Sequence, residues 1–326
     1  MAIAFCLLLL LVIIVKVIGF MEGERLLLDA WHEYRLHRMK LSDLDEQHAA
    51  SSPKSKVIIS LTSIPSRLPF MEPTLKSLLR QSCPAKEIHL YLPAYSQREK
   101  TAYVVPPGLK GLKSIRIIEC DRDWGPATKF IPAVLSLPAS QDILVVDDDR
   151  IYPPHFVADL LAAAQELPGC ALSMTGWNAP ADLIDRPTTI LSNLLMLAPA
   201  PVHGVRLRAP RPIDILQGMS GYWIKPEFFD LTRLVDYGEA PPAAFFVDDV
   251  WMGAQCLVPK FVIPTRRAGF PVKGSFALHK ASALGHINRG NGDHLSRNNT
   301  IMLKHFAERW LVHQKKGNSQ FGNDGF

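Results

Sequence analysis

Three consecutive aspartates follow a short apolar run near the middle of the chain. Residues 143–146 are apolar and rich in β-branched side chains, and Asp147, Asp148 and Asp149 come directly after them. Adjacent carboxylates repel one another, so a cation is expected close by. Carboxylates suit a hard divalent ion such as Mg²⁺ or Mn²⁺, which keeps coordination positions open for substrate phosphates. The segment therefore predicts a site for a metal ion and a diphosphate group.

A solvated turn is the plainer interpretation of the same aspartates, because Asp also favours turns and helix N-caps. Pro153 and Pro154 mark such a break shortly downstream. One aspartate is enough for a turn, whereas three follow a buried strand here, so we favour the metal site. If the strand continued through them, Asp147 and Asp149 would point to one side and Asp148 to the other.

Alternating strand and helix patterns surround the three aspartates. Apolar β-branched runs predict strands, and amphipathic stretches between them predict helices. The expected strands are 57–61, 87–92, 114–119, 143–146, 171–175, 213–218 and 260–263, and the expected helices are 72–80, 127–135, 155–167, 245–256 and 295–312. This order predicts an α/β fold with a mainly parallel sheet flanked by helices, in which ligands bind at the carboxyl ends of the strands.

Composition places the chain among globular proteins. Of its 326 residues, 48% are hydrophobic and 21% are charged, which is enough for a sizeable core. The formal net charge of +5 is mild, and Lys and Arg are scattered, so nucleic acid is not required as a partner. The five cysteines contain no Cys-x-x-Cys pair, so neither a zinc site nor a disulfide framework is indicated.

The N-terminus predicts a membrane anchor. Residues 2–20 are apolar apart from Lys16, and about 20 apolar residues span a bilayer. A cleaved signal peptide is the alternative, but the chain lacks a basic N-terminal region and a convincing cleavage site. Basic residues gather after the apolar run, so the positive-inside rule predicts a single-pass membrane protein with a cytoplasmic catalytic domain. A domain in the Golgi lumen is the alternative if the source is eukaryotic.

Changes of composition divide the rest of the chain. A helical pattern continues beyond the apolar segment to about residue 47, and a Ser- and Pro-containing linker follows. The expected divisions are a transmembrane anchor at 1–21, a juxtamembrane helix and linker at 22–54, a catalytic domain at 55–315 and a flexible tail at 316–326.

Four motifs in this order resemble those of GT-A glycosyltransferases, the nucleotide-sugar-dependent fold marked by Asp-x-Asp at a strand end. They are Ser60-Leu-Thr-Ser-Ile-Pro-Ser-Arg67, Asp123-Trp-Gly-Pro-Ala-Thr-Lys129, Asp147-Asp-Asp149 and Phe246-Val-Asp-Asp-Val-Trp251. The middle two are similar to segments of exostosin-like hexosaminyltransferases, and an N-terminal anchor is typical of family 2-like membrane enzymes. The resemblance spans about residues 57–310. It implies transfer of a sugar from a nucleotide sugar, expected to be a UDP-sugar, to a glycan or lipid-linked acceptor.

The resemblance also implies roles for residues on the donor side. The donor-contacting residues would be Thr62, Arg67, Asp123, Lys129, Asp147, Asp148 and Arg297. Independently, Arg67 offers a bidentate fork and Lys129 a point charge for phosphate. The metal ligands would be Asp147, Asp149 and a late histidine, with His294 preferred over His279 and His286. An imidazole ligand would favour Mn²⁺ over Mg²⁺.

On the acceptor side the candidates are Asp248 and Asp249. Asp249 would be the base of an inverting enzyme, or would position the acceptor in a retaining one. Trp177 and Trp251 would line the acceptor cleft, because aromatic faces suit sugar rings. Each residue also has a structural interpretation: the aspartates fit a helix cap and the tryptophans fit the core.

Two rival functions stay open. One is a metal-dependent phosphohydrolase or nucleotidyltransferase, which could use the same carboxylates. The other is a non-catalytic membrane-tethered sugar-binding protein. The sequence contains no Walker-type loop, His-Glu-x-x-His or Gly-x-Ser-x-Gly motif, which argues against P-loop, zincin and α/β-hydrolase chemistry.

Overall fold

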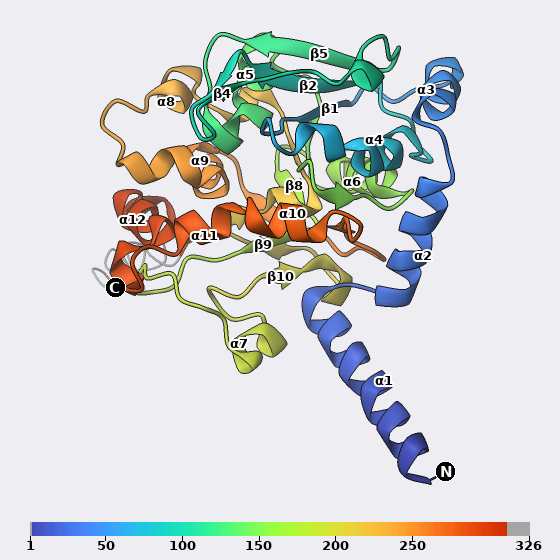
Figure 1. The fold of residues 1–326 in the computed structure, drawn as a ribbon. Helices are drawn as coiled ribbons and strands as arrows, with labels where there is room; N and C mark the ends of the chain where they lie inside the picture. The colour runs from blue at the N-terminus through green and yellow to red at the C-terminus, as the bar shows by residue number, and fades with distance from the viewer. Residues whose placement is uncertain (1, 312–326) are drawn as a thin grey trace, which may run out of the picture.

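The computed structural model describes residues 2–311. Helix α1 (Ala2–Glu22) projects from the body of the molecule, and α2 (Leu26–His37) and α3 (Leu41–Ala50) follow it (Figure 1). The single juxtamembrane helix that we expected is therefore two helices, because the backbone is extended at Lys40 between them. The predicted tail, residues 316–326, lies outside the described residues.

The prediction of a membrane-spanning helix is wrong. Among residues 2–311, no helix combines the length and the apolar character that crossing a membrane requires. The structure therefore does not support a single-pass membrane protein, nor the cytoplasmic or Golgi placement that we derived from one.

An eight-stranded sheet forms the centre of the fold, with the strand order β11-β14-β8-β13-β6-β1-β2-β5. The strands are β1 (Ile58–Leu61), β2 (Glu87–Pro93), β5 (Ile115–Cys120), β6 (Ile143–Val145), β8 (Ala171–Ser173), β11 (Arg211–Pro212), β13 (Tyr222–Ile224) and β14 (Lys260–Val262). Strands β5, β2, β1 and β6 are mutually parallel neighbours, and β8 is parallel to β14. Strand β13 is antiparallel to both β6 and β8. The predicted α/β class with a mainly parallel sheet is confirmed.

Helices cover both faces of this sheet, and β6 is buried between two cores. Ile143 and Val145 point into one core, and Leu144 and Val146 point into the other. The first core includes residues of α5 (Ile131–Ser136) and α9 (Asp248–Gln255), and the second includes residues of α4 (Glu72–Leu79) and α6 (Phe156–Glu166). A strand with helices on both faces must be apolar throughout, which explains the continuous apolar run in the sequence.

Several elements differ from the expected ones. The strand expected at 171–175 ends at Ser173, and the next residues enter β9 (Thr175–Trp177) of a separate three-stranded sheet, where β9 lies between β10 (Val202–His203) and β12 (Ile215–Leu216). The helix expected at 295–312 is the shorter α12 (Asn298–His305). We did not predict α10 (Phe276–Ala281) and α11 (Leu284–Asn288), which run across one side of the body (Figure 1).

Buried His48 on α3 generates a prediction about stability. His48 is only 1% exposed. Burial, helped by the charge of Lys54, lowers the pKa of His48 to about 4. A histidine in the unfolded chain has a pKa of about 6.5, so at intermediate pH the unfolded state binds more protons than the folded state.

We therefore expect the free energy of unfolding to fall as the pH decreases from about 6.5 towards about 4. Urea denaturation at about pH 7 and about pH 5 measures this loss. In His48→Leu the loss should be smaller, because the variant cannot take up that proton. An equal loss in the parent and the variant would contradict the prediction.

Candidate active site

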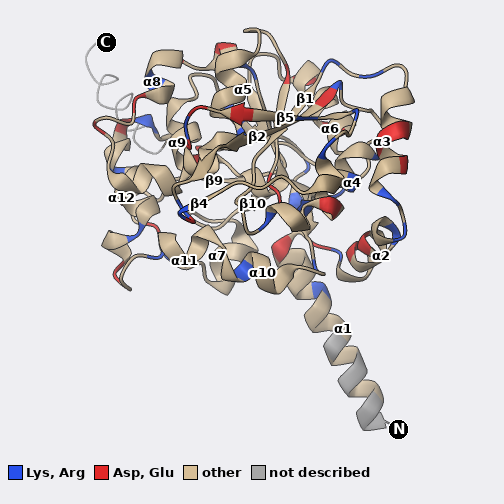
Figure 2. Cartoon of the chain, turned by 45° about the horizontal axis from the view of Figure 1, so that its top comes forward, with Lys and Arg blue, Asp and Glu red and all other residues tan. Residues whose placement is uncertain are grey.

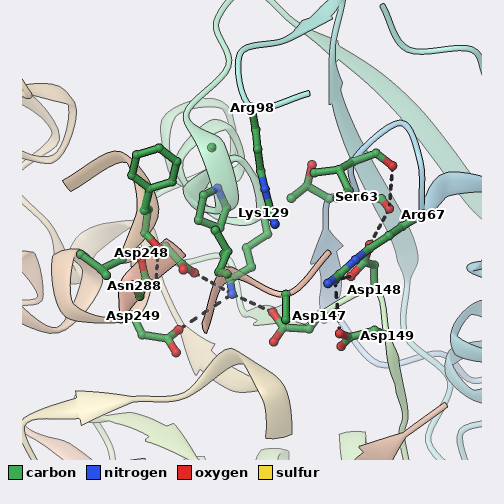
Figure 3. A pocket seen from close by; sticks show the side chains of 18 of the residues that line it. Ser63, Arg67, Arg98, Lys129, Asp147, Asp148, Asp149, Asp248, Asp249 and Asn288 are labelled. Carbon is green, nitrogen blue, oxygen red and sulfur yellow. Dashed lines mark hydrogen bonds and ion pairs between the residues drawn. The ribbon is translucent and has the colours of Figure 1, made fainter. Parts of the chain in front are cut away.

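A cavity of about 320 Å³ opens where β1 and β6 end (Figure 3). The loop after β1, the 3-10 helix η3 (Gly125–Lys129), the three aspartates after β6 and the start of α9 supply its walls. Open α/β sheets bind their ligands at this edge. The charged lining residues are Asp123, Asp147, Asp148, Asp149, Asp248 and Asp249, with Arg67, Arg98 and Lys129. Six aspartates and three cationic side chains give this lining a formal charge of −3.

The ammonium group of Lys129 joins the two acidic segments. Its Nζ lies 2.7 Å from Asp147 Oδ1, 2.6 Å from Asp248 Oδ2 and 3.8 Å from Asp249 Oδ1. Burial alone would lower the pKa of Lys129, but the three carboxylates raise it well above its ordinary value. The lysine therefore remains charged, and it holds the aspartate after β6 against the pair at the start of α9 (Figure 3).

Local structure fixes both partners in this contact. Ser60 of β1 donates a hydrogen bond of 2.6 Å to the backbone carbonyl of Lys129, which ties η3 to the sheet. The backbone N–H of Asp147 donates to the hydroxyl of Tyr152 at 2.9 Å. Tyr152 is buried, and its ring centroid lies 4.7 Å from that of Phe156 on α6. The first aspartate is thus positioned by a side chain of the core.

Arg67 compensates the other two aspartates. Its Nη1 lies 3.2 Å from both Asp148 Oδ1 and Asp149 Oδ2, and Ser63 donates a hydrogen bond to Asp148. Burial raises the pKa of both carboxyl groups, and the positive charge of Arg67 opposes that rise. Because β6 ends at Val145, the strand alternation does not continue through the aspartates, and Asp148 and Asp149 contact the same arginine.

The turn between α10 and α11 forms one wall of the cavity. Arg67 Nη2 donates to the backbone carbonyls of His279 and Ser282, at 3.0 and 3.1 Å. Arg98 also donates to the Ser282 carbonyl. Both arginines of the cavity are therefore held by this turn, and Asn288 on α11 lies at the acidic end of the site (Figure 3).

Asp249 lies at the start of α9 with its carboxylate facing the cavity. Its Oδ1 accepts a hydrogen bond of 3.1 Å from the backbone N–H of Gly218. Burial and the charge of neighbouring Asp248 raise its pKa well above the ordinary value, although Lys129 opposes this. A carboxylate with a raised pKa is a better proton acceptor near neutral pH than an ordinary one.

Most of the expected site residues lie together in this cavity. Thr62, Asp123 and Trp177 line it, with the hydroxyl of Thr62 bonded to the Tyr91 carbonyl at 2.7 Å. Trp251 does not line it. That side chain is 1% exposed and its Nε1 donates to the Leu234 carbonyl at 3.1 Å, so it packs in the core of the fold.

The late histidines and Arg297 lie outside the lining of the cavity. His294 begins the 3-10 helix η8 (His294–Ser296), and Arg297 donates to Asp185 at 2.8 Å. The side chains of His279 and His286 also do not line the cavity. The same part of the chain contributes Asn288 and Asn299 to the lining instead. Elsewhere the lining includes Ser63, which lies in the Ser60–Arg67 motif but was not singled out, and three residues outside any motif: Arg98, Tyr103 and Gln217.

The oxygen donors at the cavity fit a hard divalent ion. Within residues 2–311, no group of three His, Cys, Asp or Glu side chains is arranged to hold a metal by itself. Mg²⁺ and Mn²⁺ need only one or two carboxylates when phosphate and water complete the shell, and Asp147 and Asp149 can supply these. Gln217 adds a buried Oε1 with no hydrogen-bond partner in the described part of the chain. The formal charge of −3 also favours a cation.

Comparisons with known proteins give only distant similarities. No family model and no curated protein matches the chain. Among solved structures it is similar to the mannosyltransferase PcManGT from Pyrobaculum calidifontis in complex with GDP-Man and Mn²⁺, with 13% identity, coverage of 95% of this chain and 86% of that one, and a TM-score of 0.39.

Two further solved structures are similar to the same degree. S. aureus TarS 1-349 has 12% identity, coverage of 82% of this chain and 74% of that one, and a TM-score of 0.38. CMP:2-keto-3-deoxy-manno-octonic acid synthetase complexed with CTP has 12% identity, coverage of 72% and 99%, and a TM-score of 0.40. Similarities with TM-scores this low carry no argument about activity.

Gly218 provides a test of how tightly the site is packed. A Cβ atom at this position would collide with Lys129 Nζ and would lie 2.7 Å from Asp147 Oδ1. Gly218→Ala should therefore lower the free energy of unfolding by about 1–3 kcal/mol, because it separates the lysine from its carboxylates.

Gly108→Ala is the matched control, since nothing lies within 4 Å of its added Cβ, and it should stay within about 0.5 kcal/mol of the parent. Chemical denaturation of the three proteins measures the difference. Equal stability of the two variants would contradict the prediction that the site has no room for a side chain at position 218.

Proposed function

We propose that the chain is a nucleotide-sugar-dependent glycosyltransferase of the GT-A type that works with a divalent metal ion. One observation carries this proposal. Carboxylates from two distant segments, Asp147 to Asp149 and Asp248 to Asp249, face one cavity at the carboxyl edge of a mainly parallel sheet, and Lys129 lies between them. The carboxylates after β6 suit a metal ion with a diphosphate, and those at the start of α9 suit an acceptor hydroxyl.

The charge of the cavity supports the need for a metal. A nucleoside diphosphate is itself an anion, so a lining with a formal charge of −3 opposes its entry. A divalent ion held by Asp147 and Asp149 would offset most of that charge and would stabilise the negative charge that develops on the leaving diphosphate. Both carboxylates and the diphosphate offer oxygen ligands, which suit Mn²⁺ and Mg²⁺ alike.

The arginines of the cavity would contribute fixed positive charge on the donor side. Arg67 is already positioned beside Asp149, and Arg98 lines the same cavity. Guanidinium groups match the paired oxygens of phosphate and need no reorganisation when they are preorganised. Lys129 has a different role in this proposal, because its ammonium group is fully occupied by carboxylates.

Asp249 would accept the proton of the acceptor hydroxyl. The acceptor oxygen then bonds to the anomeric carbon, the bond from that carbon to the diphosphate oxygen breaks, and its electron pair leaves with the nucleoside diphosphate. The hydrogen bond from Gly218 orients the carboxylate, and its raised pKa suits it to act as the base. This chemistry inverts the anomeric centre. A product with retained configuration would instead assign Asp249 to positioning the acceptor.

One prediction of the proposed function concerns the metal ion and Asp149. A panel of nucleotide sugars, with UDP-sugars as the expected donors, is assayed for hydrolysis and transfer with Mn²⁺, with Mg²⁺ and with EDTA. We expect EDTA to abolish the activity and Asp149→Asn to lower it by about 100-fold or more, since each removes charge stabilisation of the leaving group.

Asp121→Asn is the control for this experiment, because Asp121 is exposed and does not line the cavity. Activity that resists both EDTA and Asp149→Asn would exclude the proposed metal role. Nucleotide turnover that needs no sugar would instead indicate a phosphohydrolase or a nucleotidyltransferase.

The second prediction concerns Asp249. Its carboxylate form is the base, so kcat/KM should fall as the pH decreases through its raised pKa. Asp249→Asn should bind the nucleotide as the parent does but lose transfer, which nucleotide titration and a transfer assay separate. Loss of nucleotide binding in this variant would indicate that Asp249 contacts the donor and not the acceptor.

A further inference from the structure

A second cavity, of about 520 Å³, lies against α2 and is separate from the candidate active site. Its size is within the range of small-molecule sites. Four segments meet there: α2, the loop after β7 (Arg150–Ile151), α6, and the loop between β14 and β15 (Phe270–Pro271). The lining residues are His32, Pro153, Pro154, His155, Asp159, Arg266 and Arg267.

Arg267 is a preorganised cation in this cavity. Its Nη2 lies 2.8 Å from Oδ1 of Asp29, a carboxylate that is 2% exposed, and its Nη1 lies 2.9 Å from Nε2 of His32. A guanidinium can only donate, so Nε2 of His32 is the acceptor. Burial and the charge of Arg267 lower the pKa of His32, and its neutral ring carries the proton on Nδ1. Because His32 lines the cavity, that proton is available to the proposal as a further donor.

Part of the positive charge around the cavity lies on arginines other than Arg267. Among the described residues, Arg35, Arg80 and Arg266 have no carboxylate within ion-pair distance. Arg35 and Arg80 lie close enough to His32 to influence its charge state, and α2 packs on α4, which ends beside Arg80. Figure 2 shows Lys and Arg residues beside both helices. Asp159 is the one acidic residue in the lining.

We propose that this cavity binds the phosphate group of a small molecule. Arginine forks match phosphate oxygens bidentately, and Arg266 can offer one because it has no carboxylate within ion-pair distance in the described part of the chain. Arg267 already contacts Asp29 and His32, so it would add only its remaining N–H donors, at little cost in conformational freedom. Pro153 and Pro154 give an apolar wall, against which an organic group attached to the phosphate can pack. The inference does not depend on the proposed transferase activity.

Calorimetric titration of the whole chain with inorganic pyrophosphate, in EDTA, tests the site. EDTA removes the divalent ion that the candidate active site would need, and the negative lining of that site then opposes the same anion. We expect saturable binding at one site. Phenyl phosphate is the second probe. If it binds more tightly than pyrophosphate, the ligand is a phosphate monoester that packs on the prolines, and if it binds more weakly, the ligand is a diphosphate.

Substitutions then locate the binding. Arg266→Gln should weaken pyrophosphate binding about tenfold or more, because it removes a charged hydrogen-bond donor. Asp159→Asn should tighten binding, since it removes the opposing carboxylate, and a merely destabilised protein would not do this. Two controls should bind as the parent does: Arg98→Gln, which removes an arginine from the candidate active site, and Lys304→Gln, which removes an exposed charge on α12.

Four results would overturn the proposal. The first is no saturable binding of either probe. The second is weakening in Arg98→Gln, which would place the anion in the candidate active site. The third is equal weakening in Arg266→Gln and Lys304→Gln, which would indicate attraction to the net charge alone. The fourth is unchanged or weaker binding in Asp159→Asn.

Discussion

The contact of one buried ammonium group with three carboxylates is the constraint on which the site depends. Lys129 Nζ touches Asp147 and Asp248 and lies near Asp249, although these residues belong to segments about a hundred positions apart in the sequence. Buried carboxylates at this density would repel one another if no cation lay between them. The lysine therefore sets the distance between the two acidic groups. Its own position follows from the hydrogen bond between Ser60 and the backbone of η3.

Two cationic side chains compensate the aspartates of the cavity, each on one side. Lys129 compensates the aspartates on one side and Arg67 compensates those on the other, so neither acidic group is left without a counter-ion. The lining nevertheless keeps a formal negative charge. A lining of this kind favours a cation before it can accept an anion. The raised pKa of Asp249 follows from the same crowding, because burial and Asp248 both disfavour its charged form.

The sequence predicted the parts of this site that local pattern controls. An apolar run before three aspartates predicted a strand buried on both faces and a carboxylate group at its end, and both are present in β6 and Asp147 to Asp149. The pattern could not predict that Lys129 would meet carboxylates from α9, because that contact depends on how distant segments pack. Arg98 and Gln217 lie in no motif, so nothing in the sequence marked them. The prediction that Trp251 lines the acceptor cleft was wrong, because a sequence motif does not show whether an aromatic side chain faces a cleft or the core.

The hydrogen bond between Tyr152 and the backbone of Asp147 has a consequence for how such a protein can change over evolutionary time. The phenol is packed against Phe156 in the interior, so the first carboxylate is aligned by the hydrophobic core and not only by its neighbours in the cavity. Selection for a new substrate and selection for thermostability would then act on overlapping residues. Families built on this arrangement should diversify through their surface loops while the interior face of α6 drifts slowly.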